Sequence, residues 1–228
     1  MTTPTSELQR RFEADGGKPT YVRHMFGRIA RVYDPMNRIM TAGLDARWRK
    51  FAVRQLALGA DALGLDVGTG TGDLAIAAIK AAGPGTHMIG VDFTTEMLEL
   101  GRPKLEKLGL ADRIELRQGD GEHLDFPDAT FDGVCSAFVV RNLADLPAGL
   151  REQYRVLKPG GRMVCLEITH PPGALFGAAF HLYFDQMIPI IGKVVGKSFE
   201  SYRYLHQSLA AFPRAPQLKR LMEAAGFT

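Results

Sequence analysis

A glycine-rich turn is the feature of the sequence that most directly indicates chemistry. It consists of Gly68-Thr69-Gly70-Thr71-Gly72-Asp73, after an apolar strand predicted over 65–67 and before a helix predicted over about 74–82. Glycines in such a turn let the backbone approach a ligand, and the N-terminus of the following helix offers unpaired N–H groups. This order of elements predicts a nucleotide site, although such a turn also occurs without a ligand.

The spacing of the glycines and of the nearby acids narrows the class of ligand. The dinucleotide fingerprint has its third glycine one position later than Gly72, which disfavours an NAD enzyme. Asp66 precedes the first glycine by two residues, and a carboxylate there suits an ammonium group and repels a pyrophosphate. Asp92 ends the next predicted strand, where it can accept hydrogen bonds from both ribose hydroxyls. S-adenosylmethionine, a positively charged nucleoside without phosphates, fits these requirements.

Two of the acids also have structural interpretations. Asp92 could favour the N-terminus of the helix predicted to begin near Thr94. Asp120 could bond the adenine amino group from the end of the third strand, or it could be a turn residue. We favour the ligand-binding interpretation because the strand end and the glycine turn agree. The residues expected to bind the donor are Asp66, Gly68, Thr69, Gly70, Thr71, Gly72, Asp92, Phe93, Asp120, Gly121 and Ala137.

The elements that position these residues alternate along the chain. Helical patterns separate apolar strands, which are predicted at 65–67, 87–92, 114–118, 131–140 and 162–168. This alternation predicts an α/β fold of the Rossmann-like type, with a mostly parallel sheet and helices on both faces. A polar, mobile arm is expected over 1–19. The helical region that follows it carries Pro35, which is expected to stop or bend its first helix.

Composition limits the class of protein. The chain has 228 residues, of which 46% are hydrophobic and 23% are charged, as is ordinary for a soluble globular protein. A net charge of +3 gives no case for a nucleic-acid partner. The two cysteines, Cys135 and Cys165, exclude a disulfide scaffold and are expected in the core. We expect no secretory signal, no transmembrane helix and no metal site, and a cytoplasmic location.

Several further segments resemble the UbiE/MenG family of ubiquinone and menaquinone biosynthesis C-methyltransferases, which are class I enzymes that use S-adenosylmethionine. These segments are Tyr33-Asp34-Pro35-Met36-Asn37, Trp48, Asp125-Phe126-Pro127-Asp128, Arg141-Asn142-Leu143, the stretch 155–162 continuing to Glu167, and Ser201-Tyr202-Arg203-Tyr204-Leu205. The resemblance extends from about Lys18 to the end of the chain. The sequence departs from the family at Asp45, where histidine is usual, and at 138–140, where Phe-Gly-Leu is usual.

The resemblance implies the transfer of a methyl group to a ring carbon of a polyprenyl quinol. Arg141 would stabilise the quinolate, and Asn142 and Tyr33 would orient the reacting hydroxyl. Arg141 could instead form a surface ion pair with Asp145, and Tyr33 could be a core residue. The expected substrate-binding residues are Tyr33, Asn37, Arg141, Tyr202 and Tyr204.

The resemblance also implies a domain organisation. We expect a flexible arm over 1–19, a helical cap over 20–60 and a methyltransferase domain over 61–228 that lacks the last two strands of the family. A helical insertion at about 170–210 either takes the isoprenoid tail or is ordinary core. A homodimer and peripheral membrane contact, to which Lys193 and Lys197 would be suited, are left open. Two alternative functions are methylation of another small aromatic acceptor and donor binding without catalysis.

Overall fold

The computed structural model describes residues 7–171 and 199–228. In this part of the chain, five parallel strands form one sheet in the order β3-β2-β1-β4-β5. They are β1 (Leu63–Val67), β2 (His87–Asp92), β3 (Ile114–Gln118), β4 (Phe131–Ala137) and β5 (Leu157–Leu166). The strand order reverses between β1 and β4, so the carboxyl ends of these strands open the crevice where ligands of such sheets bind.

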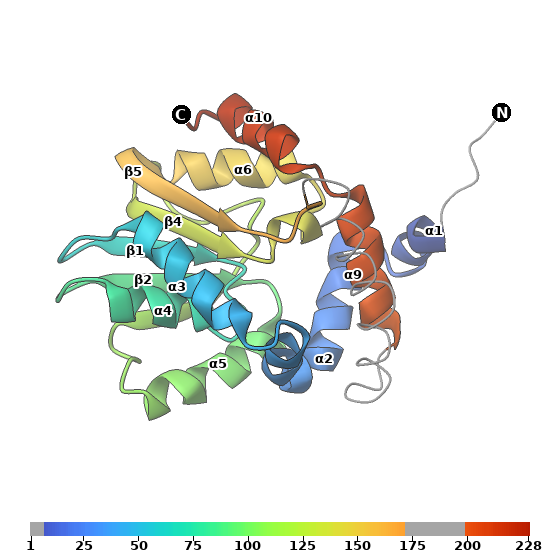
Figure 1. Cartoon of the computed structure of the whole chain (residues 1–228), viewed down its shortest axis with the longest axis horizontal. Helices are drawn as coiled ribbons and strands as arrows, with labels where there is room; N and C mark the ends of the chain where they lie inside the picture. Colours follow the sequence, from blue (N-terminus) through green and yellow to red (C-terminus); the bar gives the residue numbers. More distant parts are fainter. Residues whose placement is uncertain (1–6, 172–198) are drawn as a thin grey trace.

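Helices cover both faces of the sheet (Figure 1). On one face lie α3 (Leu44–Leu56), α4 (Asp73–Ala81) and α5 (Thr95–Lys107). Their apolar side chains form one core with the sheet, which includes Leu56, Leu74, Met88, Leu98 and Cys135. On the other face lies α6 (Leu146–Arg155), against which α10 (Ala215–Ala225) packs. The expected sheet, with helices on both faces, is confirmed.

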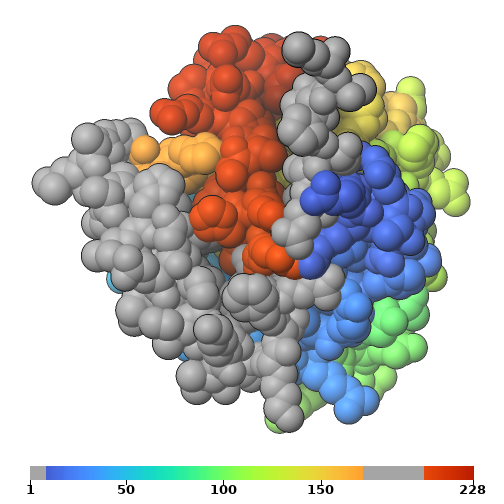
Figure 2. Space-filling view, turned by 90° about the vertical axis from the view of Figure 1, so that its right-hand side faces the viewer, coloured from blue at the N-terminus to red at the C-terminus, as the bar shows by residue number. Residues whose placement is uncertain are grey.

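The N-terminal helices lie across the carboxyl end of the sheet. There α2 (Lys18–Met40) contacts α9 (Phe199–Ala211), and α1 (Glu7–Ala14) packs on α2. Figure 2 shows these helices on the outer surface at this end, α1 and α2 in blue and α9 in orange-red. Met36 on α2 and Leu209 on α9 are buried together. A ligand at the strand ends is therefore covered by α2.

The N-terminal region differs from the expectation in two ways. The segment expected to be a mobile arm contains α1 and the start of α2, because Phe12 packs edge-on against Tyr21 with 5.4 Å between the ring centroids. Of the two expectations for Pro35, that it stops or bends the helix, the stop is wrong, because α2 continues to Met40. The missing N–H of the proline is tolerated because the following residue, Met36, is held in the core with α9.

The bounds of the fourth and fifth strands also differ from the predicted ones. The strand expected over 131–140 ends at Ala137, because Phe138 adopts a left-handed φ of 60° and the chain then forms a short 3-10 helix, η1 (Val140–Asn142). The turn expected at 158–161 is an irregularity within β5. The apolar insertion, with Lys193 and Lys197, lies outside the described residues except for its last helix, α9.

Candidate active site

The glycine turn has the backbone conformation that its sequence predicts. Gly68, Gly70 and Gly72 have φ values of 67°, 56° and 86°, which favour glycine over other residues. The N–H groups of Gly68 and Thr69 both donate to the carbonyl oxygen of Val91, at 2.7 and 3.0 Å. These bonds hold the turn against the end of β2, so that its open side lines a pocket beneath α2.

We expect Gly68→Ala to disrupt this turn. A Cβ on Gly68 would lie 2.2 Å from Cγ2 of Val139, which stands where the resembled family usually has glycine. Strain and overpacking together should lower the free energy of unfolding by about 1–3 kcal/mol and weaken donor binding. Urea unfolding and calorimetric titration of S-adenosylmethionine measure the two effects.

Two further variants separate the clash from the backbone strain. In a Val139→Gly background, Gly68→Ala should cost less, because the clashing side chain is gone. Gly70→Ala should show strain alone, because nothing lies within 4 Å of its Cβ position. Equal losses in all three proteins would contradict a role for the contact with Val139.

Asp66 is buried below the turn with one oxygen engaged and one without a partner. Its Oδ2 accepts hydrogen bonds from Thr69 Oγ1 at 2.8 Å and from the backbone N of Ala75 at 3.1 Å. Its Oδ1 is buried and has no partner among the described residues. Burial raises the pKa of the Asp66 carboxyl to about 7. One oxygen thus braces the turn and the start of α4, and the other is left for a donor group such as an ammonium.

This pKa leads to a pH-dependent prediction. A cationic donor needs the ionised carboxylate, so its affinity should rise about tenfold from about pH 6 to about pH 8. Because the pKa is raised in the folded state, the same group makes the free protein lose stability as pH rises from about 4 to about 7. Asp66→Asn should flatten both dependences. Titration calorimetry and thermal unfolding across this range test them, and an unchanged pH slope in Asp66→Asn would contradict the assignment.

Asp92 binds the N-terminus of α5, which is its structural role, and it also lines the pocket. Its Oδ1 accepts from the backbone N of Thr94 and its Oδ2 from the backbone N of Gly70, each at 2.8 Å. Burial raises its pKa in spite of these bonds. Each carboxylate oxygen can accept a second hydrogen bond, so the geometry is compatible with ribose hydroxyls as further donors.

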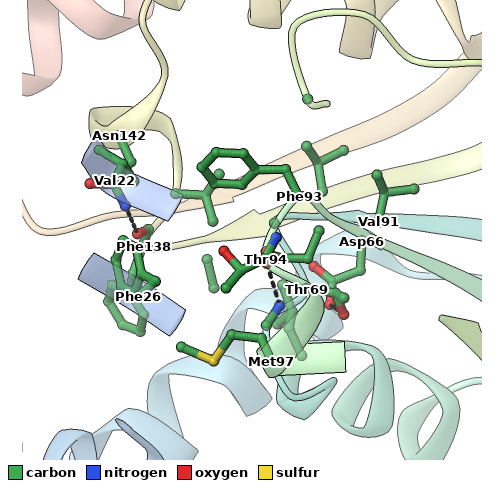
Figure 3. Close-up of a pocket in the computed structure, with 18 of the residues that line it drawn as sticks. Val22, Phe26, Asp66, Thr69, Val91, Phe93, Thr94, Met97, Phe138 and Asn142 are labelled. Atoms are coloured by element: carbon green, nitrogen blue, oxygen red, sulfur yellow. Dashed lines mark hydrogen bonds between the residues drawn. The ribbon is translucent and has the colours of Figure 1, made fainter. Parts of the chain in front are cut away.

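Most of the remaining wall of this donor pocket comes from four segments (Figure 3). They contribute Val22 and Phe26 from α2, Phe93, Thr94 and Met97 around the start of α5, 119–122 after β3, and 137–139 with 142–144 at and after the end of β4. All the predicted donor-binding residues except Gly72 line the pocket. The Asp120 side chain is exposed, and its Oδ1 accepts from the N–H of Glu122 at 2.9 Å, so its turn role is also present.

Arg141 forms a buried ion pair that its sequence neighbours do not predict. Its guanidinium pairs with Glu167, and the two side chains are only 7% and 3% exposed. Asp145 instead caps α6 by accepting from the N–H of Ala148 at 2.9 Å. The alternative interpretation, a surface ion pair between Arg141 and Asp145, is therefore wrong. Burial alone would lower the pKa of Arg141, but Glu167 raises it above its ordinary value. Arg141 is therefore a permanent, fixed cation.

A second pocket adjoins the donor pocket and is mostly apolar. It shares Phe26, Tyr33 and Phe138 with the donor pocket. Its lining residues are Met25, Phe26, Ile29, Tyr33, Met36, Asn37, Met40, Thr41, Asp45, Phe138, Arg141, Ile168, Tyr204 and Leu205. Four of the predicted substrate-binding residues are thus brought together. The fifth, Tyr202, lies on α9, and its side chain is outside the described part.

Asn142 and Tyr204 connect the two pockets. The Asn142 amide donates to the carbonyl oxygen of Phe138 at 3.2 Å and accepts from the Tyr204 hydroxyl at 3.1 Å. Lys18, at the start of α2, donates to the carbonyl oxygen of Arg141 at 3.2 Å. These bonds fix the η1 turn between α2 and α9, and sequence reasoning gave no signal for Lys18.

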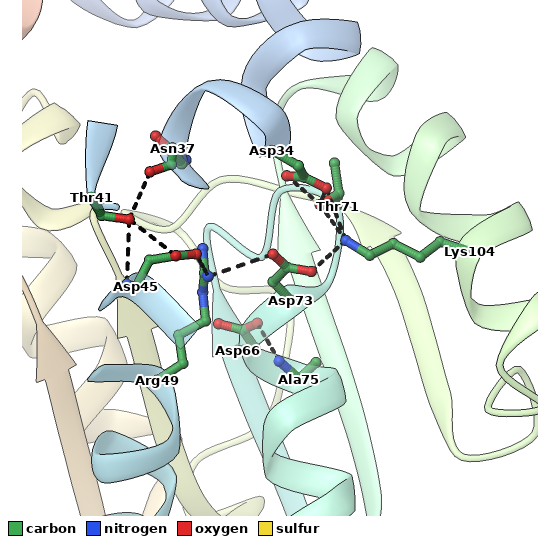
Figure 4. Close-up of polar contacts among 10 residues, drawn as sticks. All are labelled: Asp34, Asn37, Thr41, Asp45, Arg49, Asp66, Thr71, Asp73, Ala75 and Lys104. Atoms are coloured by element: carbon green, nitrogen blue, oxygen red, sulfur yellow. Dashed lines mark hydrogen bonds and ion pairs between the residues drawn. The ribbon is translucent and has the colours of Figure 1, made fainter. Parts of the chain in front are cut away.

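A polar network ties the N-terminal helices to the glycine turn (Figure 4). Thr71 Oγ1 donates to Asp34 on α2 at 2.8 Å, and Lys104 Nζ on α5 donates to the same carboxylate at 2.9 Å. Lys104 also pairs with Asp73, which lies 3.6 Å from Arg49 of α3. Arg49 pairs in turn with the buried Asp45. Asp45, which replaces the histidine of the resembled family, thus has a structural partner.

Other expectations concern single features. Among residues 7–171 and 199–228, no group of His, Cys, Asp and Glu is arranged as metal ligands would be. Cys135 is buried in β4, and Cys165 on β5 is partly buried. No described helix is both long enough and apolar enough to cross a membrane.

A parallel sheet in this order, with a pocket at the carboxyl ends of β1 and β4, is the Rossmann-like architecture that class I methyltransferases share with other nucleotide-binding enzymes. The model of the ubiE/COQ5 methyltransferase family matches residues 15–228, and the chain belongs to this family. This membership confirms the expected enzyme class and its donor, S-adenosylmethionine.

Relatives support the assignment. The chain is 44% identical to the demethylmenaquinone methyltransferase of Thermus thermophilus, over 90% of this chain and 91% of that protein. It is 40% identical to the ubiquinone/menaquinone biosynthesis C-methyltransferase UbiE of Geotalea daltonii, over 90% of this chain and 87% of that protein. A SAM-dependent methyltransferase from Thermotoga maritima has the same fold, with a TM-score of 0.62, 22% identity and coverage of 90% of this chain and 80% of that one.

Proposed function

We propose that this chain methylates a ring carbon of a polyprenyl quinol, with S-adenosylmethionine as the methyl donor. The observation that carries the proposal is the shared wall of Phe26, Tyr33 and Phe138 between the donor pocket and an apolar pocket that contains the buried Arg141. Relatives named for demethylmenaquinone and for ubiquinone/menaquinone biosynthesis support a quinol as the acceptor.

The residues of the donor pocket fit the proposed donor. The buried, unpartnered Oδ1 of Asp66 suits the ammonium of its methionine part. Asp92 suits the ribose, and the open side of Gly70 leaves room for a ligand against the backbone. S-adenosylmethionine supplies an already activated methyl group, so the protein needs mainly to align the acceptor and exclude water.

On the acceptor side, the residues would stabilise a quinolate. A ring carbon becomes nucleophilic when the neighbouring hydroxyl loses its proton, and the fixed charge of Arg141 would stabilise the oxyanion. Its Nε is buried without a partner among the described residues, which leaves a donor for that oxygen. Burial raises the pKa of Tyr33, so its hydroxyl stays protonated and can orient the substrate as a hydrogen-bond donor. The Asn142 amide, held by Tyr204, would complete this set.

Two other functions are less well supported. Methylation of a different small aromatic acceptor would use the same pockets, and the departures at Asp45 and 138–140 are the features that favour it. Donor binding without catalysis would not need the buried Arg141 and Glu167 pair. A homodimer remains a prediction.

A direct assay distinguishes these functions. The purified chain is incubated with S-adenosylmethionine and a demethylated naphthoquinol, a demethylated benzoquinol or an unprenylated phenol, and the mass and the methylated atom of the product are determined. We expect one added methyl group on the ring carbon of at least one quinol. Donor binding without methylation of either quinol would contradict the proposal, and transfer only to unprenylated phenols would favour the different acceptor.

A further inference from the structure

An exposed patch of apolar and basic residues on α3 and the end of α2 plays no part in the two pockets. We define this α3 patch as four apolar and four basic side chains: Ile39, Leu44, Trp48 and Phe51 with Arg38, Arg47, Lys50 and Arg54. Phe51 is 64% exposed and Ile39 is 47% exposed. Four of the seven large hydrophobic residues that are exposed in the described part of the chain lie here. Their concentration in one short stretch needs an explanation.

The helical spacing separates this patch from the core-facing side of α3. Leu44, Trp48 and Phe51 follow each other at intervals of four and three residues, so they form one stripe. The opposite side of α3 is buried against the sheet and α4. In Figure 1, α3 lies across the front of the sheet with no other labelled element over it. The apolar stripe therefore faces outward.

The charge of the patch is of one sign. Arg47, Lys50 and Arg54 lie beside the apolar stripe, and Arg38 lies at the end of α2. The only acid between Arg38 and Ala57 is Asp45, which is buried and paired with Arg49. A second copy of the chain would therefore bring like charges together across this surface. An anionic partner with an apolar interior fits both features.

We propose that the α3 patch docks the protein on an anionic bilayer surface. Aromatic and aliphatic side chains beside lysine and arginine are the composition of interfacial membrane-binding helices, and basic residues gain from the negative surface potential of such a membrane.

The position of the patch would bring the acceptor pocket close to the membrane, and this role in substrate capture rests on the proposed function. Met36, Asn37, Met40 and Thr41, at the end of α2, line the apolar acceptor pocket, and they adjoin the patch in the chain. A prenylated quinol dissolved in the bilayer would then meet the pocket on the docked side of the protein.

Trp48 is the only tryptophan of the chain, so tryptophan fluorescence reports directly on the patch. Vesicles of phosphatidylcholine with about one-third phosphatidylglycerol should shift its emission to the blue, and brominated acyl chains should quench it. Pure phosphatidylcholine vesicles and high salt should weaken both effects. Unchanged emission with the anionic vesicles would overturn the proposal. A blue shift that depends on protein concentration without vesicles would also overturn it, by showing a self-interface.

Variants that keep Trp48 test the two components of the patch. Arg47→Glu, Lys50→Glu and Arg54→Glu together should reduce the vesicle affinity by about tenfold or more, and Leu44→Ser with Phe51→Ser should abolish the quenching. Matched controls are Lys107→Glu and Leu108→Ser, both at exposed positions at the end of α5. Circular dichroism verifies that each variant is folded. Equal vesicle affinity in the patch variants and the controls would overturn the proposal.

An activity assay separates this inference from the proposed function. The charge variant should methylate a detergent-dispersed quinol at the normal rate and a vesicle-embedded quinol several-fold more slowly. Vesicle binding without any methylation would support the docking surface and contradict only the proposed acceptor. Equal rates of the variant and the unmodified chain on vesicles would contradict the use of the patch in substrate capture.

Discussion

The double variant Arg141→Gln, Glu167→Gln is expected to lose about a hundred- to a thousandfold in kcat, the usual effect of removing one oxyanion-stabilising donor. The reason is that Arg141 is the buried cation of the acceptor pocket, where the quinolate would form. Donor affinity should stay within about twofold of the unmodified chain, because neither residue lines the donor pocket. Single-turnover kinetics and calorimetric titration of S-adenosylmethionine measure the two quantities.

The double variant is preferable to Arg141→Ala for a structural reason. Removing Arg141 alone leaves the Glu167 carboxylate buried without its partner, which costs about 3–5 kcal/mol of stability. Loss of activity in the single variant would then mix catalysis with unfolding. Replacing both residues by glutamine keeps the shape at position 167, shortens the side chain at position 141 and leaves no unpaired charge buried. If the folded double variant turns over normally, the assigned role of Arg141 is wrong.

Asp92→Ala is expected to weaken the binding of S-adenosylmethionine by about 1.5–3 kcal/mol, or about ten- to a hundredfold. The variant loses the acceptor proposed for the ribose and also the bonds that Asp92 accepts from Gly70 and Thr94. Both the donor affinity and the stability of the turn should therefore fall. Calorimetric titration and urea unfolding give the two numbers separately.

Asp92→Asn is the matched control for the charge. The asparagine keeps one acceptor oxygen, but its NH₂ group would face one of the two backbone N–H groups. We therefore expect it to bind the donor with an affinity between those of the alanine variant and the unmodified chain. If stability falls in both variants and donor affinity does not, Asp92 only braces the turn and the start of α5.

The pattern of apolar residues was sufficient to predict β2, β3 and the donor side of the site. The second and third strands have the predicted bounds. The second is a short, mostly apolar stretch that ends at Asp92, and the third alternates apolar and polar residues up to the turn after Gln118. The glycine turn was equally predictable, since its positive φ angles restrict the residue type. These features are local in the chain.

The acceptor side could not be predicted in the same way. The alternative role of Arg141, a surface ion pair with Asp145 four residues on, assumes a helix. In the structure η1 ends at Asn142, and Asp145 caps a new helix. The true partner, Glu167, is 26 residues away on the far side of a strand crossover. The apolar stripe of α2 could be recognised in the sequence. Which of its residues pack in the core and which line the acceptor pocket depends on the position of α9, which the sequence does not give.

The bond between Thr71 and Asp34 has a consequence for the barrier to methyl transfer. Thr71 belongs to the donor turn, and Asp34 is the chain neighbour of Tyr33 in the acceptor pocket. The two reactant sites are thus linked by the contacts of Thr71 Oγ1 with both Asp34 oxygens, at 2.9 and 2.8 Å, and Lys104 reinforces this link from α5. The donor and the acceptor then lose most of their translational entropy when they bind, before the methyl group is transferred. The activation entropy of the chemical step should therefore be close to zero.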